Sequence, residues 1–358
     1  MKLIIIQDNL SPHTNELLNL FEDSDIKVIY YCISDKFNGQ EFTNRKYKTK
    51  FYKNKLDLLF LYKLARSSEK IIVTGWMNIN TMLIILGFFL LRKKYYFYTD
   101  RPMKINKYKI LKKIIRFYTY LLLRHSRVVM ICVGELAVEF FKQNGFKNKL
   151  INLPMIHNYD NKFITRSEKL NWRYKNFKLE TNTILAIVGS RMEYIKGFDL
   201  LIEAVNSLPK KYHKFLKIIL YGNGSQKQNL IKLINKKNLS ENFIILDWLD
   251  SEVMLKYINM SDIYIHPSRF DAYGPSYLPL SMGVTVIGSN MAGAAVDRIV
   301  DGYNGFIYQY DRPLLLSEKI LFFIKNIHKL DKFGKNAYDY TKDRFSSKNI
   351  INNFKKEL

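Results

Sequence analysis

Short apolar runs rich in β-branched and aromatic residues alternate with longer helical patterns along most of this chain, and this alternation limits the possible folds more than any other feature. The runs show no regular change between apolar and polar residues, which is typical of parallel strands buried on both faces. The segments between them are long enough for crossover helices, so the sequence predicts an α/β protein with doubly wound parallel sheets. The runs lie at residues 2–7, 26–33, 70–75, 94–99 and 128–133, and then at 183–190, 216–224, 242–247, 262–267 and 284–289.

Two domains are expected, because 358 residues are too many for one ordinary core and suit two domains of roughly 150 to 180 residues. The alternation stops in a polar stretch near the middle of the chain, which indicates a connection between domains. The expected division is a first domain at 1–160, a linker at 161–182, a second domain at 183–340 and a final helix at 341–358.

Composition sets the broad class of the protein. Hydrophobic residues make up 47% of the chain, which is ample for packed interiors and excludes disorder throughout. Cys32 and Cys132 are far apart and lack metal-ligand spacing, so we expect two reduced thiols and a cytosolic protein. The N-terminal apolar run is short and no small-residue cleavage site follows it, which favours a first strand over a signal peptide.

The formal net charge of +25 favours binding to polyanions such as nucleic acid, anionic lipid or phosphorylated substrates. Between Arg92 and Arg127 there are twelve lysines and arginines against Asp100 alone, a net charge of +11. The positive charge is therefore concentrated in about one-tenth of the chain.

Two segments in and beside this basic region could contact a membrane. Residues 82–91 are apolar but have about half of the ~20 residues needed to span a bilayer, which favours a buried or membrane-edge helix over a transmembrane one. Residues 104–124 separate basic from apolar side chains at about 100° per residue. Two interpretations remain open, an ordinary solvated helix face or attachment to an anionic membrane surface through 82–127. The basic arc comprises Lys109, Lys112, Lys113 and Arg116, and the apolar arc comprises Tyr108, Leu111, Ile115, Tyr118 and Leu122.

The stretch G-S-R-M-E-Y-I-K-G-F-D-L-L-I-E-A at 189–204 is the first that carries chemistry. A buried strand ends at Gly189, where the backbone can approach a ligand because no Cβ intervenes. Arg191 and Lys196 follow on the loop that leads into an amphipathic helix. Two cations at the carboxyl end of a parallel strand suit a diphosphate, although two solvated loop charges would give the same pattern.

Two further strand ends carry turn and anion-binding signals. The stretch L-Y-G-N-G-S-Q-K at 220–227 has a G-x-G signal that a tight turn explains equally well. In P-S-R-F-D-A-Y-G-P-S-Y-L-P-L-S-M-G-V at 267–284, Pro275 stands at an expected helix start, where free backbone N–H groups form an anion site. Asp271 lies about one turn upstream and is placed to accept hydrogen bonds from the hydroxyls of a polyol.

Together these stretches resemble the C-terminal half of the retaining family-4 glycosyltransferases. The shared pattern is G-S-R-x4-K-G-x-D-L-L-I-E-A, then G-x-G, P-S-R-F-D-A-Y-G and V-I-G-S-x-M-A-G-A-A-x-D-x-I-x-D-G-x-N-G-F, over roughly 130 residues. More loosely, S-P-H at 11–13 and Y-T-D-R-P at 98–102 resemble a branch that builds bacterial surface polysaccharides. The resemblance implies a GT-B fold, in which two Rossmann-like domains face a central cleft and the last helix returns to the first domain.

The resemblance also implies residue roles. Arg191 and Lys196 match the pair that neutralises the diphosphate of a nucleotide-sugar donor, which makes a metal ion unnecessary. Asp271 matches an acid that holds donor-sugar hydroxyls, and transfer occurs with retention and without an enzymic nucleophile. His13 and Asp100 are candidates for acceptor or donor-sugar contacts, although a loop-capping role for His13 fits equally well. The donor-binding set further comprises Gly189, Gly222, Gly224, Tyr273, Gly274, Pro275 and Ser276.

One position departs from the family pattern. The motif E-x7-E has a second acid that usually binds the nucleotide ribose, and this chain has Pro279 there. Loss of a charge-assisted bond to the ribose costs about 1.5–3 kcal/mol of donor binding. Ser276 or Ser281 could replace the acid, the donor could bind weakly, or the protein could be an inactive member. The proline also removes a helical hydrogen bond, so the helix should be short or kinked.

The resemblance, taken with the composition and the basic region, implies a cytosolic enzyme, peripheral to the inner face of the cell membrane, that transfers a hexose from a nucleotide-diphosphate sugar to a growing, lipid-linked glycan in O-antigen or capsule synthesis. No metal or other cofactor is expected. A catalytically silent GT-B scaffold subunit and a basic nucleic-acid-binding protein are the alternatives. The second is disfavoured because the basic segment has a long apolar face and no recognised nucleic-acid module. A dinucleotide dehydrogenase is disfavoured because no G-x-G-x-x-G follows the first strand.

Overall fold

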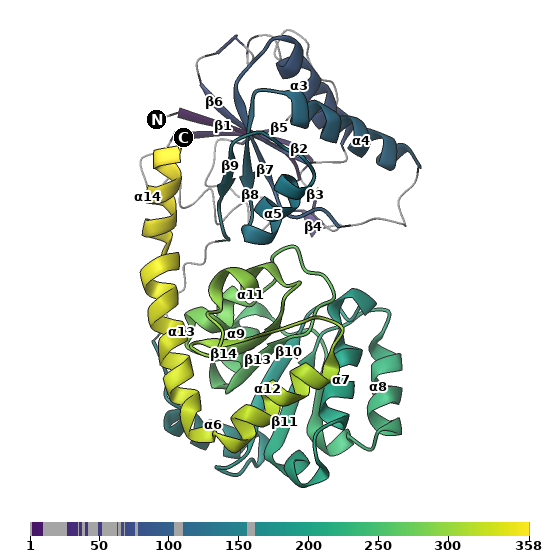
Figure 1. The fold of residues 1–358 in the computed structure, drawn as a ribbon, viewed down its shortest axis with the longest axis vertical. Coiled ribbons are helices and arrows are strands. Elements are labelled where there is room, and N and C mark those ends of the chain that lie inside the picture. The colour runs from purple at the N-terminus through teal and green to yellow at the C-terminus, as the bar shows by residue number, and fades with distance from the viewer. Residues whose placement is uncertain are drawn as a thin grey trace. The chain divides into compact units, whose positions relative to one another are not determined.

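The chain folds into two compact units (Figure 1). Unit 1 comprises Met1–Asn158 together with Ser347–Leu358, and unit 2 comprises Tyr159–Ser346. A computed structural model describes residues 2–9, 27–34, 36–37, 40–41, 49–51, 63, 66–67, 69–75, 78–103, 110–155 and 162–357.

Unit 1 contains a seven-stranded sheet in the order β5-β2-β1-β6-β7-β8-β9, and every neighbouring pair is parallel. Its strands are β1 (Lys2–Asn9), β2 (Lys27–Ser34), β5 (Thr49–Phe51), β6 (Lys70–Thr74), β7 (Tyr95–Thr99), β8 (Val128–Cys132) and β9 (Leu150–Asn152), and β3 (Lys36–Phe37) pairs antiparallel with β4 (Gln40–Glu41). Among its described helices are α3 (Ile79–Leu90), α4 (Ile110–His125), α5 (Glu135–Gln143) and α14 (Ser347–Glu357). The order is that of a doubly wound sheet, in which the direction of winding reverses between β1 and β6.

Unit 2 contains a six-stranded parallel sheet in the order β12-β11-β10-β13-β14-β15. Its strands are β10 (Ile184–Gly189), β11 (Leu216–Tyr221), β12 (Phe243–Leu246), β13 (Ile263–His266), β14 (Thr285–Ser289) and β15 (Gly305–Tyr308). Its α-helices are α6 (Arg166–Phe177), α7 (Phe198–Asn206), α8 (Lys227–Lys236), α9 (Ser251–Met260), α10 (Tyr277–Ser281), α11 (Gly293–Arg298), α12 (Pro313–Lys325) and α13 (Leu330–Phe345).

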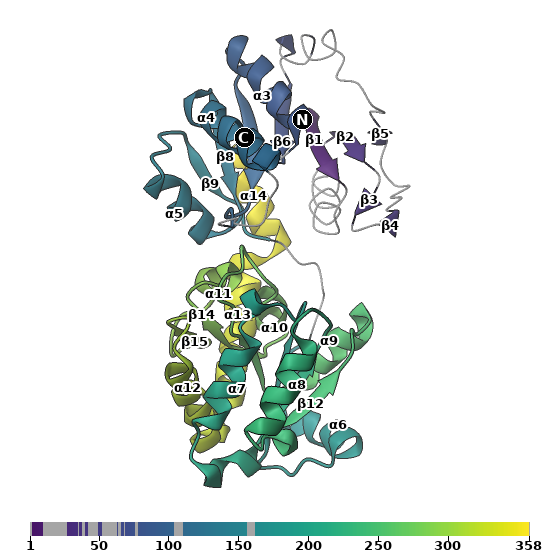
Figure 2. The same ribbon diagram turned by 90° about the vertical axis from the view of Figure 1, so that its right-hand side faces the viewer.

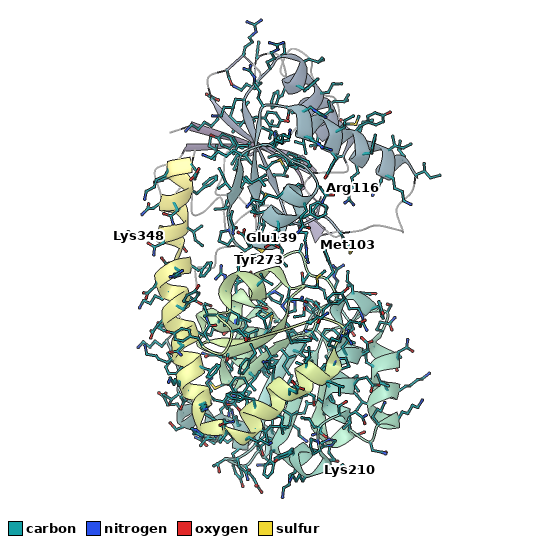
Figure 3. The ribbon with its side chains drawn as sticks, in the orientation of Figure 1. Met103, Arg116, Glu139, Lys210, Tyr273 and Lys348 are labelled. Atoms are coloured by element: carbon teal, nitrogen blue, oxygen red, sulfur yellow. The ribbon has the colours of Figure 1, made fainter. Side chains whose placement is uncertain are left out.

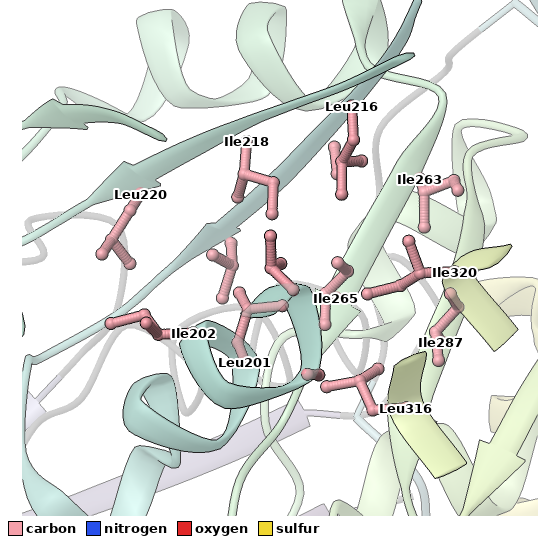
Figure 4. Close-up of a cluster of buried hydrophobic side chains, with 14 of the residues drawn as sticks. Leu201, Ile202, Leu216, Ile218, Leu220, Ile263, Ile265, Ile287, Leu316 and Ile320 are labelled. Carbon is pink, nitrogen blue, oxygen red and sulfur yellow. The ribbon is translucent and has the colours of Figure 1, made fainter. Parts of the chain in front are cut away.

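Two hydrophobic layers, one on each face, hold the sheet of unit 2. Successive side chains of a strand point to opposite faces. Ile184, Ala186 and Val188 of β10 therefore pack with α7, α8 and α12 in one cluster, part of which Figure 4 shows. Leu185 and Ile187 pack with α9, α11 and α13 in the other cluster. The helices α7 and α8 of the first layer lie toward the viewer in Figure 2.

The predicted doubly wound fold is confirmed, and each of the ten predicted strands is present with shifted ends. The strands that the sequence did not predict are short. β3 and β4 form a separate two-stranded sheet, and β5, β9 and β15 are edge strands of the two large sheets. β5 and β9 have three residues each and β15 has four, too few to show a pattern.

The predicted linker at 161–182 is wrong, because α6 occupies most of it and packs onto unit 2. The helix begins with a capping box, in which the Thr165 backbone N–H and hydroxyl donate to Glu168 Oε2 at 2.7 and 2.6 Å. Its inward face is basic, since Lys169 and Arg173 are 4% and 1% exposed. The sequence pattern gave no sign of this helix because an apolar stripe is the usual mark of a packed face.

Asp262, just before β13, holds this basic face. Its carboxylate accepts two hydrogen bonds from the Arg173 guanidinium at 2.7 and 2.9 Å and one from the Leu185 backbone N–H at 2.9 Å. Arg166 Nε lies 3.2 Å from the same carboxylate. Lys169 Nζ donates to the Ser261 carbonyl at 3.0 Å, and burial lowers the pKa of this lysine to about 8. Paired charge therefore holds α6 to unit 2, together with the apolar contacts of Trp172 and Phe177.

Within the described ranges, no helix is both long and apolar enough to cross a bilayer. The apolar run 82–91 forms most of α3, whose Ile84, Ile85 and Phe88 are buried in the core of unit 1. Cys132 is a buried free thiol at the end of β8.

Replacing Asp262 by alanine should destabilise the protein strongly. The change leaves the buried charge of Arg173 without its carboxylate, and breaking a buried pair in this way costs about 3–5 kcal/mol. Urea unfolding measures the loss of free energy. Glu203→Gln is the control, because it removes an ion pair with Lys237 in which both side chains are partly exposed. Such pairs contribute about 1 kcal/mol or less to the free energy of unfolding. Equal losses for the two variants would contradict the role given to Asp262.

Candidate functional site

The strand order of unit 2 reverses between β10 and β13. The chain moves from β10 to β11 and β12 on one side, and from β13 to β14 and β15 on the other. Loops that leave the carboxyl ends of two such neighbouring strands lead in opposite directions and leave a crevice between them. In unit 2 these are the loops that carry the predicted residues after β10 and after β13.

Arg269 ties the two loops together. Its backbone N–H donates to the Ile195 carbonyl at 2.9 Å, and its guanidinium donates to both carboxylate oxygens of Asp199 at 2.7 Å. The guanidinium also lies 4.0 Å from the ring centre of Tyr194. Because Tyr194 and Ile195 belong to the turn that precedes α7, this clamp fixes the position of the next residue, Lys196.

Lys196 and Asp271 meet across the crevice as an ion pair. Lys196 Nζ lies 2.5 Å from Asp271 Oδ2, and the two side chains are 15% and 13% exposed. The residues are 75 positions apart in the sequence, so only the parallel sheet brings them together. The structure thus combines a predicted diphosphate ligand with a predicted sugar ligand in one cluster.

His266, the last residue of β13, completes the cluster, and the sequence analysis did not single it out as a site residue. Its Nε2 lies 3.1 Å from Asp271 Oδ2, and its Nδ1 lies 2.5 Å from the hydroxyl of Ser276. A carboxylate only accepts hydrogen bonds, so Nε2 carries the hydrogen and donates to Asp271. The signal that could have identified His266 is its place at the carboxyl end of a buried strand, five residues before the acid.

The electrostatic balance keeps Asp271 charged. Burial by itself would raise the pKa of this carboxyl, but the hydrogen bond from His266 and the charge and hydrogen bond of Lys196 outweigh burial. They hold the pKa of Asp271 well below its ordinary value. The site therefore presents an ionised acceptor over the whole neutral range.

Gly274 makes room for this cluster. Its backbone has φ of +79°, and a Cβ at this position would lie 2.3 Å from His266 Cε1 and 2.8 Å from the Asp271 carboxyl carbon. Both conformation and space therefore require glycine here.

The three other predicted glycines pack the loops against each other. A Cβ on Gly189 would lie 2.0 Å from the Tyr221 ring, and one on Gly222 would lie 2.0 Å from the Ser190 carbonyl oxygen. A Cβ on Gly224 would lie within 3 Å of Met192 backbone atoms. These contacts give each glycine a structural reason that does not depend on a ligand.

The remaining predicted residues of the β13 loop fall into two groups. Pro275 borders a small pocket, together with Gly189, Ser190, Lys196, His266 and Ser268. Tyr273 and Ser276 are buried, and their hydroxyls contact protein groups, namely Arg298 Nε at 3.2 Å and His266. The side chains of Tyr273 and Ser276 thus support the loop from within. The Ser268 hydroxyl is buried and has no hydrogen-bond partner among the described residues.

Pro279 lies within α10, a helix of only five residues that ends at Ser281. The helix is therefore short, as the proline in the sequence predicts. The proline is buried, and its carbonyl accepts a hydrogen bond from the Val284 N–H at 2.9 Å. Ser281, the second candidate to replace the missing acid, donates its hydroxyl to the Leu278 carbonyl at 2.7 Å.

Three predicted residues remain, namely Arg191, Asp100 and His13. Arg191 is exposed on the same loop as Lys196. Asp100 is exposed and follows β7 in unit 1. His13 lies outside the described residues. Across the part of the chain that the structure covers, no three His, Cys, Asp or Glu side chains form a group that could hold a metal ion.

Comparison with known proteins gives one family and several relatives. Residues 168–340 match the family described as glycosyl transferases group 1. An uncharacterized glycosyltransferase of Methanocaldococcus jannaschii is 26% identical over 63% of this chain and 57% of its own length. The O-antigen biosynthesis glycosyltransferase WclY of Escherichia coli is 28% identical over 54% of this chain and 53% of its own length. The chain thus spans little more than half the length of these relatives.

Solved structures match the whole chain. HepE of Anabaena in complex with UDP has a TM-score of 0.78 at 15% identity, covering 100% of this chain and 99% of that protein. HepE in complex with UDP-glucose has a TM-score of 0.73 at 15% identity, covering 100% and 99%. The likeness shows the fold, which is the GT-B fold of two parallel-sheet domains.

Replacing Gly274 by alanine should destabilise the protein more than the same change at Gly302. Both glycines have a left-handed backbone, with φ of +79° and +75°, so the backbone cost of about 1–2 kcal/mol is common to the two. A Cβ on Gly302 meets nothing within 4 Å, whereas one on Gly274 displaces His266 or Asp271. Urea unfolding of both variants isolates that difference. A loss for Gly274→Ala no larger than for Gly302→Ala would show that the cluster is not tightly packed.

Proposed function

We propose that this chain, in which residues 168–340 form a domain of the glycosyl transferases group 1, transfers a hexose from a nucleoside-diphosphate sugar to a lipid-linked glycan. The observation that carries the proposal is the ion pair of Lys196 with the charged, largely buried carboxylate of Asp271. The relative named for O-antigen synthesis and the solved structure that holds UDP-glucose support this donor class and a role in bacterial surface polysaccharide synthesis.

Donor binding changes the partner of Lys196. In the structure its ammonium faces Asp271, and the diphosphate of an arriving donor competes for that ammonium with a higher charge. Lysine suits this exchange because its ammonium is a point charge on a flexible stem. Arg191, exposed on the same loop, adds a planar guanidinium that matches two phosphate oxygens.

Asp271 then binds the sugar. After Lys196 turns to the diphosphate, the hydrogen bond from His266 still orients the carboxylate. An ionised carboxylate accepts charge-assisted hydrogen bonds from sugar hydroxyls, and the low pKa of Asp271 keeps it in that state. His266 is a positioning residue in this account, because it acts through Asp271.

Transfer breaks the bond between the sugar C1 and the diphosphate oxygen and forms a bond from C1 to the acceptor oxygen. The acceptor's proton passes to the departing diphosphate oxygen on the same face of the sugar, so the configuration at C1 is retained. Lys196 and Arg191 stabilise the charge that grows on the diphosphate as the bond breaks, a role that requires no metal ion.

The ribose is held without the second motif acid. The Ser276 hydroxyl contacts His266, and the Ser281 hydroxyl donates to the Leu278 carbonyl. Neither hydroxyl carries a charge that could replace the acid for which this chain has Pro279. We therefore expect the donor to bind about 1.5–3 kcal/mol more weakly than it would with a charge-assisted bond to the ribose.

Replacing Arg191 and Lys196 together by alanine should abolish stabilisation by nucleoside diphosphates. A ligand at about a hundredfold its dissociation constant adds ~2.7 kcal/mol of stability, which thermal unfolding with UDP, ADP, GDP and dTDP would detect. Lys232→Ala/Lys236→Ala, two exposed lysines of α8, is the control and should keep the shift. If no nucleoside diphosphate stabilises the unmodified protein, the donor site fails and a silent scaffold subunit becomes the better account.

Replacing Asp271 by asparagine should separate binding from transfer. The change removes the carboxylate that competes with the diphosphate for Lys196, so UDP should bind at least as tightly as before. Sugar transfer should fall by about a hundredfold or more, because the charged acceptor for the sugar hydroxyls is gone. Isothermal titration gives the first quantity and product formation the second. A variant that loses UDP binding as fully as Lys196→Ala would contradict the exchange of partners.

A further inference from the structure

Helix α4 carries apolar residues on two opposite faces. Ile115, Thr119 and Leu123 are 7%, 1% and 0% exposed and face the rest of unit 1. At about 100° per residue their directions centre on one side of the helix. A surface helix of a globular protein needs one such face, and its opposite face is normally polar.

The opposite face is apolar and open to solvent. Ile110, Ile114, Phe117 and Leu121 fall within an arc of about 60° on the side away from the core, and we call them the outer face of α4. Their exposed fractions are 77%, 46%, 63% and 43%, and those of the adjoining Leu111 and Tyr118 are 65% and 52%. Scattered single apolar residues on a surface need no explanation, but a continuous stripe of this kind marks a binding surface.

This arrangement corrects the two-arc pattern expected for 104–124. Ile115 alone of the expected apolar arc is buried within α4, whereas Leu111 and Tyr118 are exposed. Lys109 and Tyr108 lie outside the described residues. The apolar side chains of α4 thus serve two surfaces, and the single apolar arc expected from the sequence combines residues of both.

The charge beside the outer face is positive. Lys113 and Arg124 are exposed and border it on one side, and α4 contains no acidic residue. Arg116 lies farther round the helix, where its guanidinium donates to the Met103 carbonyl at 2.9 Å (Figure 3). The outer face therefore combines apolar side chains with cations at its border, the pattern of a helix that lies in a lipid–water interface.

The end of α3 repeats this combination in the same unit. Phe89, Leu90 and Leu91 are 38%, 69% and 41% exposed, and the exposed Arg92 and Lys94 follow them. α3 and α4 pack against each other, so both sets of exposed apolar and basic residues belong to one helical layer of unit 1 (Figure 1).

We propose that the outer face of α4 docks onto the surface of an anionic lipid bilayer. The apolar side chains would enter the boundary between headgroups and acyl chains, and the cations would remain at the level of the anionic headgroups. A second copy of the chain fits less well, because two like faces would bring Lys113 and Arg124 against the same positive charges. The proposal does not depend on the donor site, since it needs only unit 1 surface residues.

Vesicle flotation with the full chain tests the proposal. The protein should float with vesicles of phosphatidylcholine and phosphatidylglycerol and much less with phosphatidylcholine alone. Ile114→Ser/Phe117→Ser/Leu121→Ser and, separately, Lys113→Glu/Arg124→Glu should each weaken binding by about tenfold or more. The matched controls lie on unit 2. The apolar control, Trp248→Ser/Val253→Ser/Leu314→Ser, removes three exposed apolar side chains, and the charge control is Lys232→Glu/Lys236→Glu. Both control variants should bind the vesicles as well as the unmodified protein does.

Circular dichroism and thermal unfolding establish that each variant is folded, as expected for changes at exposed positions. Equal binding to the two kinds of vesicle, or binding that survives both α4 variants, would overturn the proposal. The proposal would also be overturned if the protein does not bind vesicles but forms a dimer that the α4 substitutions dissociate. Tighter binding to duplex DNA than to anionic vesicles at the same salt concentration would overturn it as well. Nucleoside diphosphate binding should be unchanged in the α4 variants, which separates this test from that of the donor site.

Discussion

A carboxylate can stay ionised in a largely buried position only if its neighbours compensate for the lost water, and the candidate site of unit 2 is built on this constraint. Asp271 has Lys196 at 2.5 Å and His266 at 3.1 Å, and these contacts more than offset the effect of burial on its pKa. The supporting structure follows from the same need. Ser276 orients the other side of the His266 ring, and Gly274 leaves the space that the ring and the carboxylate occupy. The strand reversal between β10 and β13 supplies the crevice in which these residues meet.

The same cluster explains how a donor site can exist before a donor arrives. Without a ligand, Lys196 and Asp271, the proposed partners of the diphosphate and of the sugar hydroxyls, neutralise each other. Neither charge is then buried without a partner, which would be costly. In the proposed function, the donor substitutes its own phosphate and hydroxyl groups for that internal contact. The site is thus ordered in advance, which lowers the reorganisation needed during the reaction.

The fold and the site differ in how far the sequence could predict them. Buried parallel strands are continuous apolar runs, so the main strands and the residues at their carboxyl ends, Lys196 and Asp271 among them, could be located. The ion pair itself and the packing of Gly222 against Ser190 are contacts between distant segments, which no local pattern encodes. His266 lies only five residues before Asp271, but its hydrogen bond to the carboxylate depends on how the loop after β13 folds. α6 was missed because much of its buried face consists of cations that pair with Asp262 or a backbone carbonyl, and only Trp172 and Phe177 add large apolar contacts.

In the proposed function, Lys196 exchanges Asp271 for the diphosphate of a donor. A crystal structure of the protein with UDP bound tests this most directly, because it shows both partners of the ammonium at once. The account predicts a phosphate oxygen within hydrogen-bond distance of Lys196 and another near Arg191, with Lys196 moved away from Asp271 and the His266–Asp271 hydrogen bond intact. A structure in which UDP binds while Lys196 keeps its contact with Asp271, or in which UDP lies away from the loops after β10 and β13, would contradict it.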